Sequence, residues 1–251
     1  MDCRIRAFGA CMIGGFPHRY EDSFFHLAFE WLRPETATRI IPTIYTMGGF
    51  PVTRVAKHLP TRCLTENPDI VVLQFATSDL IVPIRKDHRH HGHSSSPAQR
   101  KVTATAATPA HHLKWWLRSF YTDALRLSPV TPPEAYLATM TFLTRTLLEH
   151  QVIPVVLSPF VFGGGRSDRL ACDCSSRLQA AVASLPRAVY VDAYAALARQ
   201  PRAKMLLSDG THLSLAGQRV VADALFPCLK NLVTNQSWFV KNSPPSPPPR
   251  A

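Results

Sequence analysis

The sequence has no long apolar run. A membrane-spanning helix needs about 18 or more consecutive apolar residues, and no such stretch occurs in the 251 residues. We therefore expect neither a membrane span nor a membrane partner. Residues 1–6 carry charges where a secretory signal needs an apolar run, which predicts a cytoplasmic protein.

Cysteine is scarce, and its spacing argues against a structural zinc site. None of the six cysteines forms the Cys-x-x-Cys pair that is typical of such sites. In a reducing compartment these cysteines would mostly remain thiols. The only close pair, Cys172 and Cys174, is better interpreted as two small residues at the start of a helix than as a redox motif, which has two intervening residues.

Acidic residues are few: 17 Asp and Glu stand against 28 Lys and Arg, a net charge of +11. Residues 85–128 hold eight Lys and Arg against two Asp and Glu, so this segment alone carries +6. Basic charge within one insertion is typical of a solvated loop, and no nucleic-acid-binding motif accompanies it. Nucleic acid is therefore not expected as a partner, although anion or nucleic-acid binding stays open as the weaker alternative.

Residues 85–112 combine six of the eleven histidines with runs of Ser and Thr. Such a composition cannot bury enough apolar surface to order itself, so it predicts a flexible insertion. Clustered histidines can bind a metal, but without partner carboxylates or cysteines a solvated tract is favoured for His88, His90, His91 and His93. We therefore expect no metal and no cofactor. Residues 233–251 are rich in proline and are predicted to form a disordered tail.

Strand and helix patterns alternate along most of the chain. Apolar runs of strand length occur at 3–8, 39–45, 69–75, 152–157 and 188–192, and helical spacing of apolar residues occurs at 24–32, 52–59, 133–150, 169–185 and 214–225. This order predicts one α/β domain over residues 1–232, with a flavodoxin-like, three-layer α/β/α doubly wound parallel sheet. In such sheets the loops at the carboxyl ends of the strands form the ligand site.

A candidate catalytic motif stands directly before the last predicted helix. In Asp209-Gly210-Thr211-His212, a carboxylate lies three residues before an imidazole on a tight turn. The carboxylate can fix the imidazole tautomer and stabilise its protonated form, as acyl transfer by a general base requires. Taken alone, the motif fits equally well an aspartate that caps the turn beside an exposed histidine.

With its neighbours, this motif resembles the SGNH (GDSL-type) hydrolases, which carry four short blocks in fixed order around a flavodoxin-like sheet. Their last block, Asp-x-x-His, is matched by Asp209 and His212. Their third block, Gly-x-Asn-Asp, corresponds to residues 76–79, with Ala for Gly and Ser for Asn. The second block is a glycine, matched by Gly49, and the first, Gly-Asp-Ser, corresponds to Gly9-Ala10-Cys11. The resemblance covers most of residues 3–230.

The resemblance implies site residues for acyl transfer. Cys11 would be the nucleophile, His212 the base and Asp209 its orienting group, as in Cys-His hydrolases. The oxyanion donors would be the backbone amides of Cys11 and Gly49 and the hydroxyl of Ser78. Gly9 and Asp79 would support the site. The alternative for Cys11 is a buried structural cysteine after the first strand.

The resemblance implies a hydrolase that cleaves an acyl ester of a small molecule or a carbohydrate, as an esterase, a deacetylase or an acyltransferase. The residues that differ from the family pattern in the first and third blocks favour an alternative, a catalytically silent SGNH-like domain that binds a glycan or a protein. Four aromatic residues beyond the central strand could stack on a sugar or acyl group, but their spacing favours the apolar face of a covering helix: Trp115, Trp116, Phe120 and Tyr121.

Overall fold

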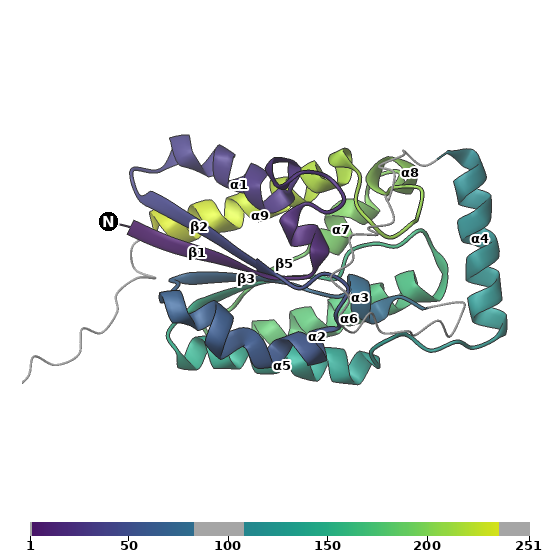
Figure 1. The fold of residues 1–251 in the computed structure, drawn as a ribbon, viewed down its shortest axis with the longest axis horizontal. Helices are drawn as coiled ribbons and strands as arrows, with labels where there is room; N and C mark the ends of the chain where they lie inside the picture. Colours follow the sequence, from purple (N-terminus) through teal and green to yellow (C-terminus); the bar gives the residue numbers. More distant parts are fainter. Residues whose placement is uncertain (1, 83–107, 236–251) are drawn as a thin grey trace, which may run out of the picture.

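A computed structural model describes residues 2–82 and 108–235 of the chain (Figure 1). Five parallel strands form one sheet in the order β2-β1-β3-β4-β5. The bounds are Asp2–Gly9 for β1, Arg39–Thr46 for β2, Ile70–Gln74 for β3, Ile153–Leu157 for β4 and Val189–Val191 for β5. The predicted flavodoxin-like parallel sheet is confirmed.

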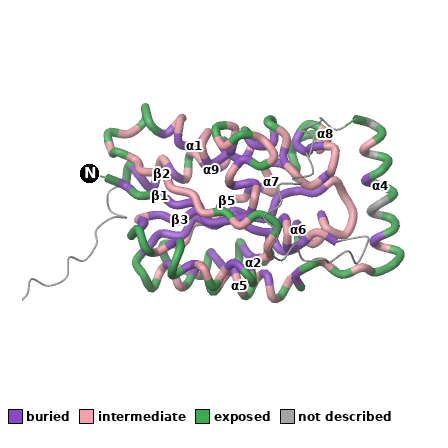
Figure 2. The backbone as a smooth tube through the Cα atoms, viewed as in Figure 1, coloured by how far each residue is buried: buried purple, intermediate pink, exposed green. Residues whose placement is uncertain are grey.

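Two clusters of buried side chains cover the two faces of the sheet. In the central strand, Ile70 and Val72 face one cluster, and Val71 and Leu73 face the other, as the alternation of side chains in a strand requires. The first cluster is closed by α1 (Phe24–Leu32), α7 (Ala193–Ala198) and α9 (Leu215–Thr234). The second is closed by α2 (Val52–Val55), α5 (Pro133–Glu149) and α6 (Gly165–Ala183). Figures 1 and 2 show the resulting three layers.

The register of the first three strands sets the position of the site. Gly9, the last residue of β1, pairs with Thr46 on one side and with Gln74 on the other. The three strands therefore end at one level, and the loops that follow them emerge next to one another. A side chain on Gly9 would not fit, because its Cβ would lie 2.3 Å from the carbonyl oxygen of Gln74.

Three further helices lie at the carboxyl edge of the sheet. The short helices α3 (Thr77–Leu80) and α8 (Arg202–Met205) follow β3 and α7. The longer α4 (Pro109–Ala124) stands beyond the carboxyl ends of the strands, at the rim of the molecule (Figure 1).

Apart from shifts of up to four residues at the ends of other elements, three differences from the sequence prediction stand out. The last helix was expected to end at residue 225, but α9 continues through Pro227 because Leu229, Leu232 and Val233 bury their side chains in the core. The helix predicted over 52–59 is the single turn α2, followed by short 3-10 and π turns.

The third difference concerns the segment predicted to be flexible. Residues 109–112 of the predicted insertion belong to α4, whose N-terminus is capped by Thr108 together with His111. The rest of that insertion, with His88, His90, His91 and His93, and residues 236–251 of the predicted tail lie outside the described residues.

Candidate active site

Cys11 and His212 meet at the carboxyl edge of the sheet, although 201 positions separate them in the sequence. Cys11 begins a 3-10 turn two residues after the end of β1, and His212 lies in the loop before α9, whose first turn is capped by the hydroxyl of Ser214. The Sγ atom of Cys11 is 3.7 Å from Nε2 of His212. This distance suits a hydrogen bond that involves sulfur, so the two groups are placed to exchange a proton.

Asp209 holds the other side of the imidazole. Its Oδ2 atom lies 2.6 Å from Nδ1 of His212, and its Oδ1 atom accepts hydrogen bonds from the backbone amides of Thr211 and His212 at 2.8 and 2.9 Å. A carboxylate at Nδ1 favours the tautomer with its proton there and leaves Nε2 free to accept the proton of the thiol. The three side chains therefore form a Cys-His-Asp arrangement.

The electrostatics of this arrangement favour a charged imidazole. Burial disfavours the imidazolium form, but hydrogen bonds to Asp209 and Cys11 and their negative charges outweigh it and raise the pKa of His212 to about 9. Burial alone would raise the pKa of the Asp209 carboxyl; the hydrogen bonds from His212 and Thr211 outweigh that effect and lower it. The pair therefore stabilises a proton on the imidazole.

An aromatic side chain borders the imidazole at the surface. The ring of Phe16 packs edge-on against His212, with ring centroids 5.2 Å apart, and remains partly exposed. The next histidine, His18, places its Nε2 atom 3.0 Å from the carbonyl oxygen of Leu213. The turn after Cys11 thus contacts the loop of His212 and Leu213 at two points, which the sequence alone did not indicate.

The loop after β2 approaches Cys11 through a glycine. A Cβ on Gly48 would lie 3.1 Å from the Cβ of Cys11, which is a tight contact, so a larger residue there would require a small shift of one of the two loops. Gly49, the donor predicted from the resemblance, is the next residue. It is exposed, its φ is +78°, and there is open space around its Cβ position. Gly48 was not singled out from the sequence, although the glycine pair marked the turn.

The loop after β3 carries an unusual backbone conformation. Ala76 has a φ of +117°, a region that residues with a side chain rarely adopt, and it stands where the resembling family has glycine. Ser78, the predicted side-chain donor, is partly buried in α3 immediately beyond this position. The backbone at this position thus has a conformation that favours glycine, although the residue here is Ala76.

Asp79 ties the loops around the site together. It is fully buried, and its Oδ1 atom accepts hydrogen bonds from the backbone amide of Val52, at 2.8 Å, and from the hydroxyl of Thr131, at 2.9 Å. Val52 begins α2, three residues after Gly49. Burial raises the pKa of the Asp79 carboxyl to about 6, despite these hydrogen bonds. The predicted supporting residue therefore connects the loops after β2 and β3.

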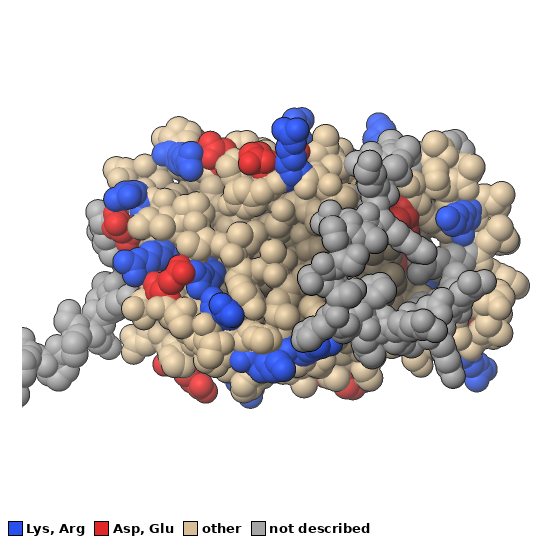
Figure 3. Space-filling model, in the orientation of Figure 1, with Lys and Arg blue, Asp and Glu red and all other residues tan. Residues whose placement is uncertain are grey.

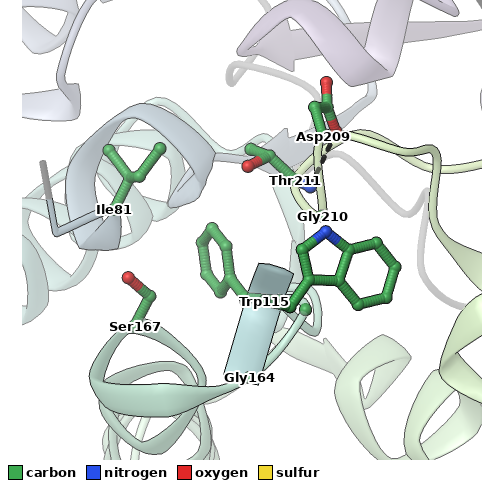
Figure 4. A pocket seen from close by; sticks show the side chains of 9 residues that line it. Ile81, Trp115, Gly164, Ser167, Asp209, Gly210 and Thr211 are labelled. Carbon is green, nitrogen blue, oxygen red and sulfur yellow. Dashed lines mark hydrogen bonds between the residues drawn. The ribbon is translucent and has the colours of Figure 1, made fainter. Parts of the chain in front are cut away.

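Trp115 of α4 packs into the loop that carries Asp209 and His212. Its indole Nε1 donates a hydrogen bond to the carbonyl oxygen of Ser208 at 3.2 Å. A Cβ on either Gly163 or Gly210 would lie 2.7 Å from the indole, so both glycines are needed to admit it. Figure 4 shows the indole in a small pocket beside Asp209. Neither Cys11 nor His212 lines this pocket.

Other candidate sites find less support. Among residues 2–82 and 108–235 no group of three or more His, Cys, Asp or Glu is placed to hold a metal ion, and no helix is long and apolar enough to cross a membrane. Cys172 is exposed and Cys174 buried within α6, and both are free thiols.

Comparisons with known proteins show which solved structures share this fold. No family profile and no curated protein sequence matches the chain. Solved structures do match. A lipase/acylhydrolase from Enterococcus faecalis aligns over 91% of this chain and 96% of its own, with a TM-score of 0.63 and 13% identity. A putative lipolytic protein of the G-D-S-L family from Desulfitobacterium hafniense aligns over 89% and 98%, with a TM-score of 0.58 and 10% identity. The chain has the SGNH hydrolase fold.

An acetyl xylan esterase shares the same fold, with a TM-score of 0.58 and 14% identity over 90% of this chain and 99% of its own. Within the SGNH hydrolase fold, the segments that resemble the four blocks follow β1, β2 and β3 and precede α9. Sequence identities of this size bear on the fold alone.

Proposed function

We propose that the protein hydrolyses acyl esters, with Cys11 as the nucleophile, His212 as the general base and Asp209 as its orienting group. Two contacts support this proposal: Sγ of Cys11 lies 3.7 Å from Nε2 of His212, and Nδ1 of His212 lies 2.6 Å from the Asp209 carboxylate. Nucleophilic catalysis by a thiol needs a base at one side and an orienting acceptor behind that base.

The acylation step follows from the position of these atoms. His212 accepts the thiol proton at Nε2, and the sulfur attacks the carbonyl carbon of the ester to form a tetrahedral intermediate. When the carbon–oxygen bond of the leaving group breaks, the imidazolium donates its proton to the departing alcohol. The product on the enzyme is a thioester between the acyl group and Cys11.

The second step removes the acyl group. Water loses a proton to His212 and attacks the thioester carbonyl, and the thiol leaves with the proton from the imidazolium. An alcohol in place of water would give acyl transfer by the same sequence of bonds.

The oxyanion donors in this proposal are the backbone amides of Cys11 and Gly49 and the hydroxyl of Ser78. A hydroxyl rotates more freely than the amide of an Asn side chain, so it is a less preorganised donor. Loss of one oxyanion donor lowers turnover by roughly 100- to 1000-fold in other hydrolases, so we expect slow turnover here.

The substrate class proposed is the acyl ester of a small molecule or a carbohydrate. The acetyl xylan esterase of the same fold supports ester chemistry of this kind. The replacement of serine by Cys11, and of asparagine by Ser78, favours a second candidate, a silent domain of this fold that binds a glycan or a protein in the same cleft.

The test is hydrolysis of p-nitrophenyl acetate and a panel of acetylated sugars by the purified protein, before and after treatment with iodoacetamide. Release of p-nitrophenol that iodoacetamide stops supports the proposal. The control is Cys172→Ala, which removes the exposed thiol of α6 and should leave both the activity and its inactivation unchanged. No activity across the panel would favour the silent binding domain.

A further inference from the structure

The helix α4 directs its apolar stripe away from the protein. Five large side chains recur at the i, i+3, i+4, i+7 and i+8 spacing of one helix face, and each is more than half exposed: Leu113, Trp116, Leu117, Phe120 and Tyr121. The opposite face holds the residues that are buried, Trp115 at 4% exposure and Thr122. A helix that only covered the sheet would show the reverse orientation.

The exposed stripe is extended and partly organised. The rings of Trp116 and Phe120 stack on each other with centroids 6.2 Å apart, while their exposed fractions are 62% and 65%. Figure 2 shows α4 as an exposed rim of the molecule. Contiguous exposed apolar surface of this kind marks an interaction site in soluble proteins.

The charge around the stripe selects the partner. Lys114 is exposed and borders the stripe on the helix, and Arg126 is exposed just beyond the end of α4. A few separate Lys and Arg side chains are visible at this end of the molecule (Figure 3). Among residues 108–128, Lys114, Arg118 and Arg126 stand against Asp123, a net charge of +2. A second copy of the chain would bring two such segments of like charge together, whereas an anionic surface would attract them.

We infer that the outer face of α4 docks on the surface of an anionic lipid bilayer. Aromatic and leucine side chains on one face with basic residues at its border are the pattern of a helix that lies in the plane of the interface, without crossing it. This differs from our expectation of no membrane partner, which rested on the absence of an apolar run long enough to span.

The position of α4 gives this docking a consequence for the active site. Trp115, on the inner face of α4, contacts the loop of Ser208 and Gly210 that carries the acid and the base. A lipid surface bound by the outer face would therefore lie beside the carboxyl edge of the sheet. If the proposed hydrolysis holds, on which this step rests, esters at the lipid surface are the substrates that docking would favour.

The test is flotation of the full-length protein with vesicles of phosphatidylcholine alone and of phosphatidylcholine with phosphatidylglycerol. We expect the parent protein to float with the anionic vesicles. The double change Trp116→Asp and Phe120→Asp should weaken this binding by at least about 10-fold, because it removes two large apolar groups from the interface. Lys114→Glu should weaken it less. The matched control is Phe142→Asp, which alters an equally exposed aromatic residue of α5 and should leave flotation unchanged.

Failure of flotation by the parent protein, or flotation that survives the double change, would overturn the inference. A dimer in analytical ultracentrifugation that the double change dissociates would assign the stripe to a second copy instead. Hydrolysis of soluble p-nitrophenyl acetate is measured in parallel and should be the same in the parent and the double variant. Flotation without any hydrolysis would refute the proposed function alone, and hydrolysis without flotation would refute this inference alone.

Discussion

The backbone amide of Val52 donates a hydrogen bond to Oδ1 of Asp79 at 2.8 Å, and this contact connects the first turn of α2 to the loop after the central strand. Among the described residues nothing donates to the second oxygen, Oδ2, which is fully buried. Burying a carboxylate with one oxygen that accepts no hydrogen bond lowers the free energy of unfolding, even though the other oxygen connects two loops.

Asp79→Asn should therefore preserve the structure and Asp79→Ala should not. The asparagine keeps an acceptor for Val52 and Thr131 and removes the charge, whereas alanine leaves two buried donors unpaired and should cost about 2–4 kcal/mol in free energy of unfolding. Because burial raises the carboxyl pKa to about 6, the parent protein loses stability as pH rises from about 4 to 6. Asp79→Asn should remove that loss, and urea unfolding at pH 4.5 and 7.5 measures it.

The catalytic proposal predicts an order of effects in three single variants. Cys11→Ala and His212→Ala should each lower kcat/KM for p-nitrophenyl acetate by at least about 1000-fold, because each removes a group that takes part in bond making. Cys11→Ser should retain measurable activity, since the same base can activate a hydroxyl. Activity that persists in Cys11→Ala would assign the nucleophile to another residue.

The raised pKa of His212 predicts a pH dependence of stability. A histidine whose pKa rises from 6.5 to about 9 on folding stabilises the protein fully below pH 6.5, and this contribution is lost as pH rises through 9. The difference in free energy of unfolding between the parent and His212→Gln should therefore shrink between pH 6 and pH 9.5. Asp209→Asn, which removes the partner at Nδ1, should flatten the same dependence. An equal difference at both pH values would show that the imidazole is not charged in the folded protein.

The positive φ of Ala76 predicts that a glycine is better at this position. Ala76→Gly releases the conformational strain of a side chain at φ +117°, and this gain exceeds the loss of one buried methyl group and of backbone entropy. We expect a rise of about 1 kcal/mol in the free energy of unfolding. The same change at Ala7, a buried residue of β1, is the control and should be destabilising. Destabilisation by Ala76→Gly would contradict the strained conformation.

Local patterns in the sequence were sufficient for the fold and for part of the site. The alternation of apolar strand runs and helical spacing predicted the parallel sheet, which the structure confirms. The spacing of Asp209 and His212 predicted their contact because the two residues lie on one tight turn. Their meeting with Cys11 followed from the rule that the loops at the carboxyl edge converge.

The remaining contacts depend on tertiary packing that no local pattern records. Gly48 lies against Cys11, and Trp115 enters between Gly163 and Gly210, only because separate loops fold onto one another. The helical spacing of α4 predicted an apolar face, but spacing cannot tell whether that face points to the core or to solvent. The sequence favoured a covering face for all four aromatic residues. Trp115 is buried as expected, whereas Trp116, Phe120 and Tyr121 are exposed.

The separation of Cys11 and His212 along the chain has a consequence for biosynthesis. The ribosome makes Cys11 201 positions before His212. At roughly 5–20 residues per second, the thiol exists for about 10–40 seconds before its partner has been synthesised. Because α9, which follows His212, packs against α1, this face of the sheet also closes only after α9 has been made. A nascent chain therefore carries the thiol of Cys11 before its imidazole partner exists, and the proposed acyl transfer can begin only after the segment with Asp209 and His212 has been made.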